Sequence, residues 1–144
     1  MEIKFYDNVD DSLLRFAVII SRFENKWVFC KHKERETFEI PGGHRENSEK
    51  IEDTAKRELY EETGAIDFDI KPVCIYSVTG KNRVNTEGNE TFGMLFFAEI
   101  KSFEHEIHSE IERIEFFDNL PKELTYPEIQ PLLIQEFLRR KNGI

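Results

Sequence analysis

The segment between residues 38 and 64 constrains the fold more than any other part of the chain. Its first residues favour a short strand, and the Pro-Gly-Gly run at 41–43 ends it, because proline lacks an N–H and glycine permits positive φ. A helix is predicted over residues 49–63, with Ser48 as its N-cap and Gly64 just past its end. The segment therefore predicts a strand, a tight turn and a helix in succession.

The rest of the chain contains several apolar runs with the composition of strands and one more helical pattern. Strands are predicted at 13–20, 26–31, 70–78, 92–100 and 111–117, and a second helix at 129–140. Mixed strands with two separated helices predict an α+β fold in which the helices pack on a mixed sheet. A chain of 144 residues is expected to form a single domain, residues 1–144.

The predicted first helix carries carboxylates on the face that should contact the core. Three apolar residues define that face: Ile51, Ala55 and Leu59. Glu58 and Glu62 fall on the same face, and Glu61 lies beside them. Unpaired carboxylates are costly to desolvate, so a cation must compensate them. Clustered carboxylate oxygens suit Mg²⁺ or Mn²⁺, whereas the alternative is pairing with neighbouring Lys or Arg side chains.

Residues 43–65 resemble the Nudix box, whose pattern is G-x5-E-x7-R-E-U-x-E-E-x-G-U with U a bulky aliphatic residue. The fixed letters are matched by Gly43, Glu49, Arg57, Glu58, Glu61, Glu62 and Gly64, and Leu59 fills the first U. Ala65 departs from the last U, a difference that concerns packing. The run before the box and residues 116–121 also look like the flanking segments of MutT-like members. The resemblance implies a Nudix-type α/β/α sandwich with a mixed β-sheet.

The resemblance also implies what the box residues do. Family members hydrolyse a nucleoside diphosphate linked to another moiety, with water attacking a phosphorus and Mg²⁺ or Mn²⁺ as the cofactor. The implied metal ligands are the carbonyl of Gly43 and the carboxylates of Glu58, Glu61 and Glu62. The implied catalytic residues include Glu61, Glu62 and Arg57, and Arg57 and Glu49 would orient the ligating carboxylates. For Arg57 the alternative is an ordinary helix ion pair with Glu61.

A further carboxylate in this family usually comes from the loop before the last strand, as general base or extra ligand. Counting back from Phe116, the best match is Glu110, which completes the predicted catalytic set. Glu106 and Glu112 are its neighbours in sequence and stay as alternatives. The other interpretation is that all three are solvated loop acids.

Binding residues outside the box are only weakly indicated. Basic residues that flank the strands are candidates for holding phosphate or form a solvated face: Arg22, Lys31, Lys33 and Arg35. Aromatic candidates for stacking a base, with a core role as the alternative, are Phe38, Phe92 and Tyr126. Four histidines show no metal-ligand spacing and are expected on the surface or in loops: His32, His44, His105 and His108.

The substrate hypotheses follow from features outside the box. Pro72 lies too close to the box to match the downstream proline of ADP-ribose hydrolases, and the chain resembles MutT-like nucleoside triphosphate pyrophosphatases. No Asn follows Leu120 and Pro121, where MutT-type enzymes read an oxidised base, which argues against 8-oxo-dGTP in particular. The first hypothesis is hydrolysis of an NTP or dNTP to the monophosphate and pyrophosphate. The alternatives are a hydrolase of a dinucleoside polyphosphate or ADP-sugar, and a nucleotide-sensing module without catalysis.

Composition narrows the partners and the compartment. A net charge of −9 argues against a nucleic acid duplex or an anionic membrane as partner, which leaves a nucleotide as the expected one. No run approaches the ~20 apolar residues of a membrane span, and no leader pattern is found, so a cytoplasmic location is expected. Cys30 and Cys74 fit no metal or disulfide spacing and are expected to be buried free thiols.

Overall fold

The fold consists of one mixed sheet between two helices, seen in a computed structural model that describes residues 1–82, 85–104, 106 and 109–142. The strands are β1 (Glu2–Tyr6), β2 (Leu14–Phe23), β3 (Lys26–His32), β4 (Phe38–Glu39), β5 (Gly42–His44), β6 (Ala65–Thr79), β7 (Thr91–Phe103) and β8 (Ile111–Phe117). The helices are α1 (Ile51–Thr63) and α2 (Gln130–Asn142), and a 3-10 turn, η1, covers Asp11–Leu13.

The sheet joins strands that are distant in sequence. Its order is β1-β6-β7-β2-β3-β4, and β5 and β8 are added by pairing with β2 and β3. β2 and β7 run parallel, with Ala17 opposite Met94, whereas the other described pairs are antiparallel. The predicted mixed sheet is therefore confirmed.

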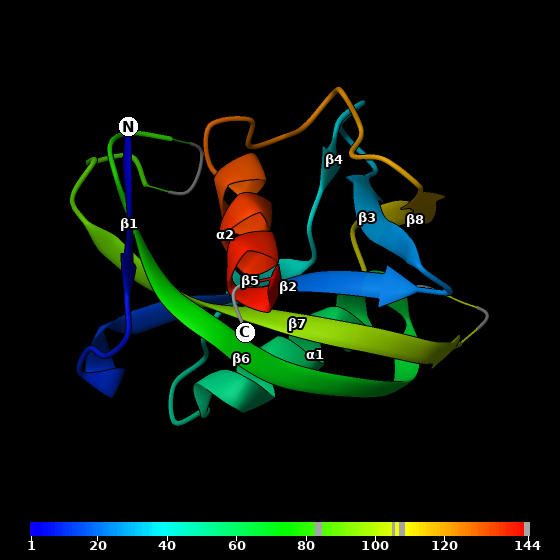
Figure 1. The fold of residues 1–144 in the computed structure, drawn as a ribbon, viewed down its shortest axis with the longest axis horizontal. Helices are drawn as coiled ribbons and strands as arrows, with labels where there is room; N and C mark the ends of the chain where they lie inside the picture. Colours follow the sequence, from blue (N-terminus) through cyan, green and yellow to red (C-terminus); the bar gives the residue numbers. More distant parts are fainter. Residues whose placement is uncertain (83–84, 105, 107–108, 143–144) are drawn as a thin grey trace.

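Helices cover both faces of the sheet, and each encloses its own core. Figure 1 shows α2 in front of β2 and β7, with α1 behind them. Successive residues of β2 point to opposite faces, so Ile19 packs in the α1 core and Ile20 in the α2 core. The helices contribute the buried residues Ile51, Ala55 and Leu59 from α1 and Leu133, Ile134 and Phe137 from α2. This arrangement confirms the α+β prediction and the α/β/α sandwich.

The start of α1 differs from the prediction. Ser48 is not the N-cap, because the helix begins at Ile51 and Lys50 occupies the cap position without a side-chain hydrogen bond. Ser48 adopts a left-handed conformation, with φ 67°, which turns the chain so that the Glu49 carboxylate reaches the Glu46 N–H and the Thr54 hydroxyl. The predicted end of the helix is confirmed: Gly64 has φ 79° and its N–H bonds to the Tyr60 carbonyl at 2.8 Å.

Two strands were not predicted. β1 is only five residues long, and it pairs with β6 at the edge of the sheet. β5 contains the two glycines that were expected to end a strand: Pro41 separates β4 from β5, and Gly42 and Gly43 then pair with β2. β6 also starts at Ala65, directly after α1, and is therefore longer than the predicted strand.

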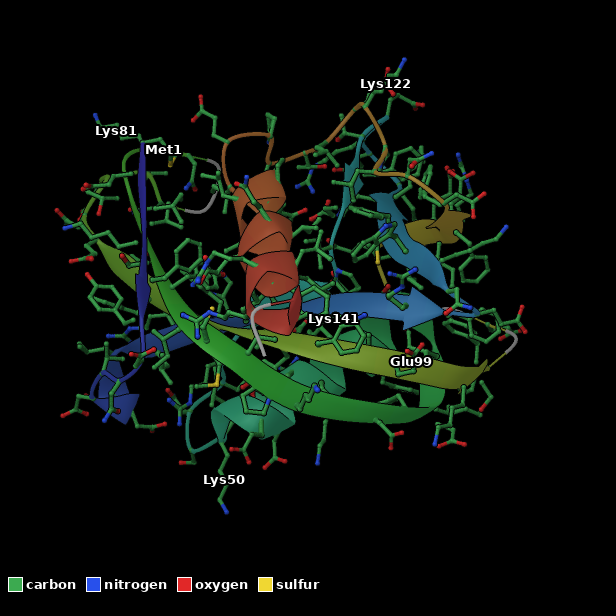
Figure 2. All side chains as sticks on the ribbon, viewed as in Figure 1. Met1, Lys50, Lys81, Glu99, Lys122 and Lys141 are labelled. Atoms are coloured by element: carbon green, nitrogen blue, oxygen red, sulfur yellow. The ribbon has the colours of Figure 1, made fainter. Side chains whose placement is uncertain are left out.

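Charged side chains such as Lys50, Lys81 and Lys122 project outward from the ribbon (Figure 2). Cys30 and Cys74 are buried free thiols, as predicted. Neither helix, within the described part of the chain, has the length and continuous apolarity needed to cross a membrane.

Candidate active site

The turn from Pro41 to Gly43 brings backbone against the acidic face of α1. The Ile19 N–H bonds to the Pro41 carbonyl at 2.9 Å, and Gly43 pairs with Ala17, so β2 fixes the position of this turn. A Cβ on Gly43 would lie 2.5 Å from both carboxylate oxygens of Glu58. Only glycine therefore allows the Glu58 carboxylate to lie this close to the backbone at position 43.

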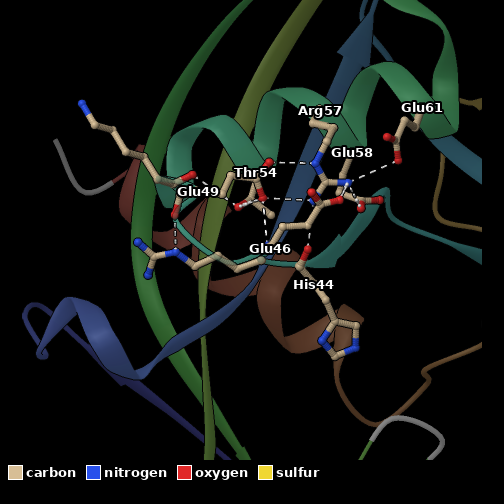
Figure 3. Close-up of polar contacts among 9 residues, drawn as sticks. His44, Glu46, Glu49, Thr54, Arg57, Glu58 and Glu61 are labelled. Carbon is tan, nitrogen blue, oxygen red and sulfur yellow. Dashed lines mark hydrogen bonds and ion pairs between the residues drawn. The ribbon is translucent and has the colours of Figure 1, made fainter.

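Arg57 connects the acidic residues of the site through its guanidinium group (Figure 3). Its Nε and Nη2 donate to the two carboxylate oxygens of Glu49, at 2.8 and 3.0 Å. Its Nη1 donates to Glu58 at 2.7 Å and to Glu61 at 3.3 Å, and Nη2 also reaches the His44 carbonyl at 3.0 Å. The helix ion pair with Glu61 is thus present, but the shorter bonds go to Glu49 and Glu58. This geometry supports the predicted orienting role of Arg57 and Glu49.

The Glu49 carboxylate should contribute stability that depends on pH. Hydrogen bonds from Arg57, and then from Thr54 and the Glu46 N–H, lower the pKa of Glu49 from 4.5 to about 2. Because the folded-state pKa lies below the unfolded value, this stabilisation is present above pH 4.5 and is lost as the pH falls towards 2. We expect Glu49→Gln to lower the unfolding free energy at pH 7 by about 2 kcal/mol.

Thermal unfolding of wild type and Glu49→Gln between pH 2 and pH 7 measures this effect. The difference in Tm should be constant above pH 5 and should shrink between pH 4.5 and 2. A difference that stays the same down to pH 2 would show that the lowered pKa of Glu49 is not its cause.

Glu58 and Glu62 carry negative charge into a poorly solvated region. Burial raises the pKa of Glu62 to about 8, although its Oε1 accepts the Gly42 N–H at 2.7 Å. Burial also raises the pKa of Glu58, against the opposing effect of Arg57. Glu61 is more exposed, with 46% of its side chain accessible. The fold therefore holds the carboxylates where a cation would lower their electrostatic cost.

The donors at this site fit a hard divalent cation such as Mg²⁺ or Mn²⁺. The carboxylates of Glu58 and Glu62 would supply oxygen ligands, and the close approach of Gly43 to Glu58 leaves no room for a side chain there. Among the described residues, no three acidic, His or Cys side chains are already gathered as a ligand cluster. Instead, Glu58 accepts a hydrogen bond from Arg57, and Glu62 accepts one from the Gly42 N–H.

A cavity of about 370 Å³ opens beside these residues. Gly42, Gly43, Glu62 and Glu110 are among the residues that line it. Apolar side chains from the sheet, from α2 and from the residues just before β5 and α2 also line it: Phe16, Val18, Ile40, Val78, Ile129 and Leu133. The volume lies at the small end of the range for small-molecule sites. Glu62, from the acidic face of α1, thus lines a pocket that also has apolar walls.

The basic and aromatic residues that the sequence suggested for substrate binding differ in whether they line the cavity. Of the four predicted basic residues only Arg35 lines the cavity, and its Nη1 bonds to Glu39 at 2.8 Å. The Lys31 ammonium is 3.3 Å from the Glu112 carboxylate, and Arg22 stacks over the Trp27 ring. Tyr126 is the aromatic candidate that lines the cavity, whereas Phe38 and Phe92 pack against the cores.

The three candidate bases also differ in position. Glu110 lines the cavity, whereas neither Glu112, which pairs with Lys31, nor Glu106, which is exposed, belongs to its lining. His32 and His44 line the cavity too: His32 is partly buried at the end of β3, contrary to the expectation of a surface or loop position, whereas His44 is exposed, as expected. The predictions for His105 and His108 lie outside the described residues.

Two polar residues of the cavity wall were missed by the sequence analysis. His32 hydrogen-bonds to the Glu110 carboxylate at 3.0 Å across the β3–β8 pair. Gln130, at the start of α2, is buried and accepts the Ile40 N–H through its Oε1 at 2.8 Å. Neither residue belongs to a motif, so only tertiary contacts could have identified them.

The fold, the acidic helix and the adjoining cavity together define a class of protein. Residues 12–137 match the family model described as the NUDIX domain, so the chain belongs to the Nudix hydrolase family. The resemblance first seen in the box therefore extends over most of the chain.

Three known proteins illustrate what this chain is similar to. The chain is 31% identical over 126 residues to YtkD of Bacillus subtilis, which is described as a proposed 8-oxo-dGTP diphosphatase. The match covers 87% of this chain and 75% of that protein. It is 29% identical over 125 residues to an ADP-ribose pyrophosphatase of Methanocaldococcus jannaschii, covering 83% and 70% of the two chains. Among solved structures, the pyrophosphohydrolase BsRppH of Bacillus subtilis superposes with a TM-score of 0.78 at 24% identity, over 98% of this chain and 90% of that one.

Proposed function

We propose that this chain is a Mg²⁺-dependent hydrolase that splits a nucleoside triphosphate, with a normal or an oxidised base, into the monophosphate and pyrophosphate. The observation that carries the proposal is that Gly43, Glu62 and Glu110 line the same cavity. In this arrangement metal ligands, a general base and a nucleotide-sized pocket lie within reach of one substrate. The complete acidic set of the box argues against a sensing module without catalysis.

Each residue has a chemical task in this proposal. When bound, Mg²⁺ would neutralise phosphate charge and lower the pKa of the attacking water. Glu58, Glu61, Glu62 and the Gly43 carbonyl would hold it, and Arg57 orients the carboxylates. Glu110 accepts the proton of the attacking water, and Arg35 binds a phosphate oxygen. The apolar part of the wall excludes bulk water and contacts the nucleoside.

The size of the cavity supports a mononucleotide. A volume of about 370 Å³ suits one nucleoside better than the two of a dinucleoside polyphosphate. The relatives named for 8-oxo-dGTP and for ADP-ribose keep an oxidised nucleotide and an ADP-sugar as candidates. The alternative function is therefore cleavage of a dinucleoside polyphosphate or an ADP-sugar at the same site.

A product assay distinguishes these functions. The protein is incubated with NTPs, dNTPs, 8-oxo-dGTP, ADP-ribose and dinucleoside polyphosphates, each with Mg²⁺, Mn²⁺ or EDTA, and the products are identified by chromatography. Metal-dependent release of monophosphate and pyrophosphate from a triphosphate supports the proposal. Turnover confined to ADP-ribose or a dinucleotide establishes the alternative, and nucleotide binding without turnover of any substrate establishes the sensing module.

The assignment of the general base gives a separate prediction. We expect Glu110→Gln to lower kcat by about 100-fold, near the low end for removal of a general base. Glu112→Gln is the matched control, because Glu112 pairs with Lys31 away from the cavity, and it should keep kcat within about twofold. Steady-state kinetics on the best substrate of the assay measures both. Equal losses in the two variants would contradict the assignment.

A further inference from the structure

His32 lies at the end of β3, where its ring forms part of the cavity wall and is largely buried. Only 16% of its side chain is accessible, whereas 88% of the Glu110 side chain is accessible. The His32 Nε2 lies 3.0 Å from the Glu110 Oε2. Next to it, the Lys33 N–H donates to the Glu110 carbonyl at 3.0 Å, which ties the backbone of the two segments together.

The other ring nitrogen determines which tautomer is present. The Glu34 N–H donates to the His32 Nδ1 at 3.2 Å, so Nδ1 acts as an acceptor. The ring proton is therefore on Nε2, and that N–H donates to the Glu110 carboxylate. A backbone bond thus fixes both the orientation of the ring and the position of its proton.

The Glu110 carboxylate needs such a contact. A side chain with 88% exposure has little packing to restrict its rotamers, and each immobilised side chain loses conformational entropy. A general base contributes only when it lies within hydrogen-bond reach of the proton that it accepts. The N–H donor of the largely buried His32 ring can restrict the position of the Glu110 carboxylate, which packing alone does not restrict.

From these contacts we propose that His32 is a positioning residue, which holds the Glu110 carboxylate in the cavity for proton transfer. This inference rests on the proposed function, in which Glu110 is the general base. His32 does not touch the reacting atoms, so its removal should cost less than the removal of Glu110. We expect a loss of about 10-fold in kcat, which is typical of residues that orient a catalytic group, with KM within twofold of wild type.

Two substitutions of His32 test the contacts of its two ring nitrogens one at a time. In His32→Asn the side-chain oxygen can replace Nδ1 as acceptor of the Glu34 N–H, but no donor reaches Glu110. In His32→Gln the longer side chain places an N–H donor near the original Nε2. We expect His32→Asn to lose about 10-fold in kcat and His32→Gln to stay within about threefold of wild type, with thermal unfolding confirming that both variants fold. Equal losses in the two variants would overturn the proposal.

A double-mutant cycle tests whether His32 acts through Glu110. In the Glu110→Gln background, His32→Asn should change kcat by less than twofold, because the group that it positions is already lost. A further 10-fold loss in that background would overturn the positioning role. If Glu110→Gln alone leaves kcat unchanged, the assignment of the base fails and the inference fails with it, whereas a loss in Glu110→Gln without a loss in His32→Asn refutes only the inference.

Discussion

Replacing Glu62 by Gln is expected to lower kcat by about 10³-fold while leaving the fold intact. In the proposed site the charge of this carboxylate helps to hold a divalent cation, and the loss of a principal electrostatic group costs 10²- to 10³-fold. The Gln oxygen can still accept the Gly42 N–H, so the backbone donor keeps its partner. Since burial raises the pKa of Glu62, the neutral side chain should unfold at the same or a higher Tm without metal.

Kinetics and thermal unfolding with and without Mg²⁺ measure both parts of this prediction. If the proposed site binds metal, Mg²⁺ should raise the Tm of wild type by mass action, and this increase should be absent in Glu62→Gln. Glu61→Gln should lose at least 100-fold in kcat, whereas Glu52→Gln, on the exposed side of the same helix, is the control with wild-type activity. Full activity in both Glu61→Gln and Glu62→Gln would refute the catalytic site proposed for this helix.

Gly43→Ala is expected to lower activity by at least 100-fold at a small cost in stability. The new Cβ would lie 2.5 Å from both carboxylate oxygens of Glu58. These atoms are at the end of a flexible side chain, so Glu58 can move away and the strand pairing of Gly43 with Ala17 can persist. The displaced carboxylate would no longer lie against Gly43, and the proposed metal site would lose Glu58 as a ligand.

Gly42→Ala is the matched comparison, because there the obstacle is backbone. Its Cβ would lie 2.6 Å from the Ala17 carbonyl oxygen and 3.1 Å from the Val18 Cα. The β2–β5 pair must then separate, and we expect a loss of about 2–3 kcal/mol in unfolding free energy. Comparing kcat and Tm for both variants separates displacement of a ligand from disruption of the sheet. A Tm for Gly43→Ala as low as that of Gly42→Ala would contradict the explanation.

Local sequence predicted the parts of the molecule whose signals are local. The α1 face, the Gly64 termination and the apolar strands depend on residues a few positions apart, and these predictions are confirmed. The Ser48 N-cap was wrong because Glu49 makes contacts with Thr54 and Arg57 that override the capping preference. β1 was missed because a five-residue edge strand gives little periodic signal, and its place depends on pairing with distant β6.

In the candidate site, too, local spacing predicted some contacts, and others depend on residues that are distant in sequence. Residues of the box lie on one helix and the turn before it, so their proximity follows from spacing along the chain. The contact between His32 and Glu110 requires the register of β3 and β8, in which His32 lies opposite Ile111. Which of Glu106, Glu110 and Glu112 reaches the cavity also depends on that register, since Glu110 lies directly before β8, beside the end of β3, whereas Glu112 lies within β8. No pattern within either segment contains this information.

The segment between β4 and β5 is held from both faces of the sheet by side chains. Gln130 of α2 accepts the Ile40 N–H, and Glu62 of α1 accepts the Gly42 N–H, two residues further along. Inserting or deleting one residue between these amides would break at least one of the two bonds. Homologous chains should therefore keep the length of this segment, and insertions should collect in loops away from it.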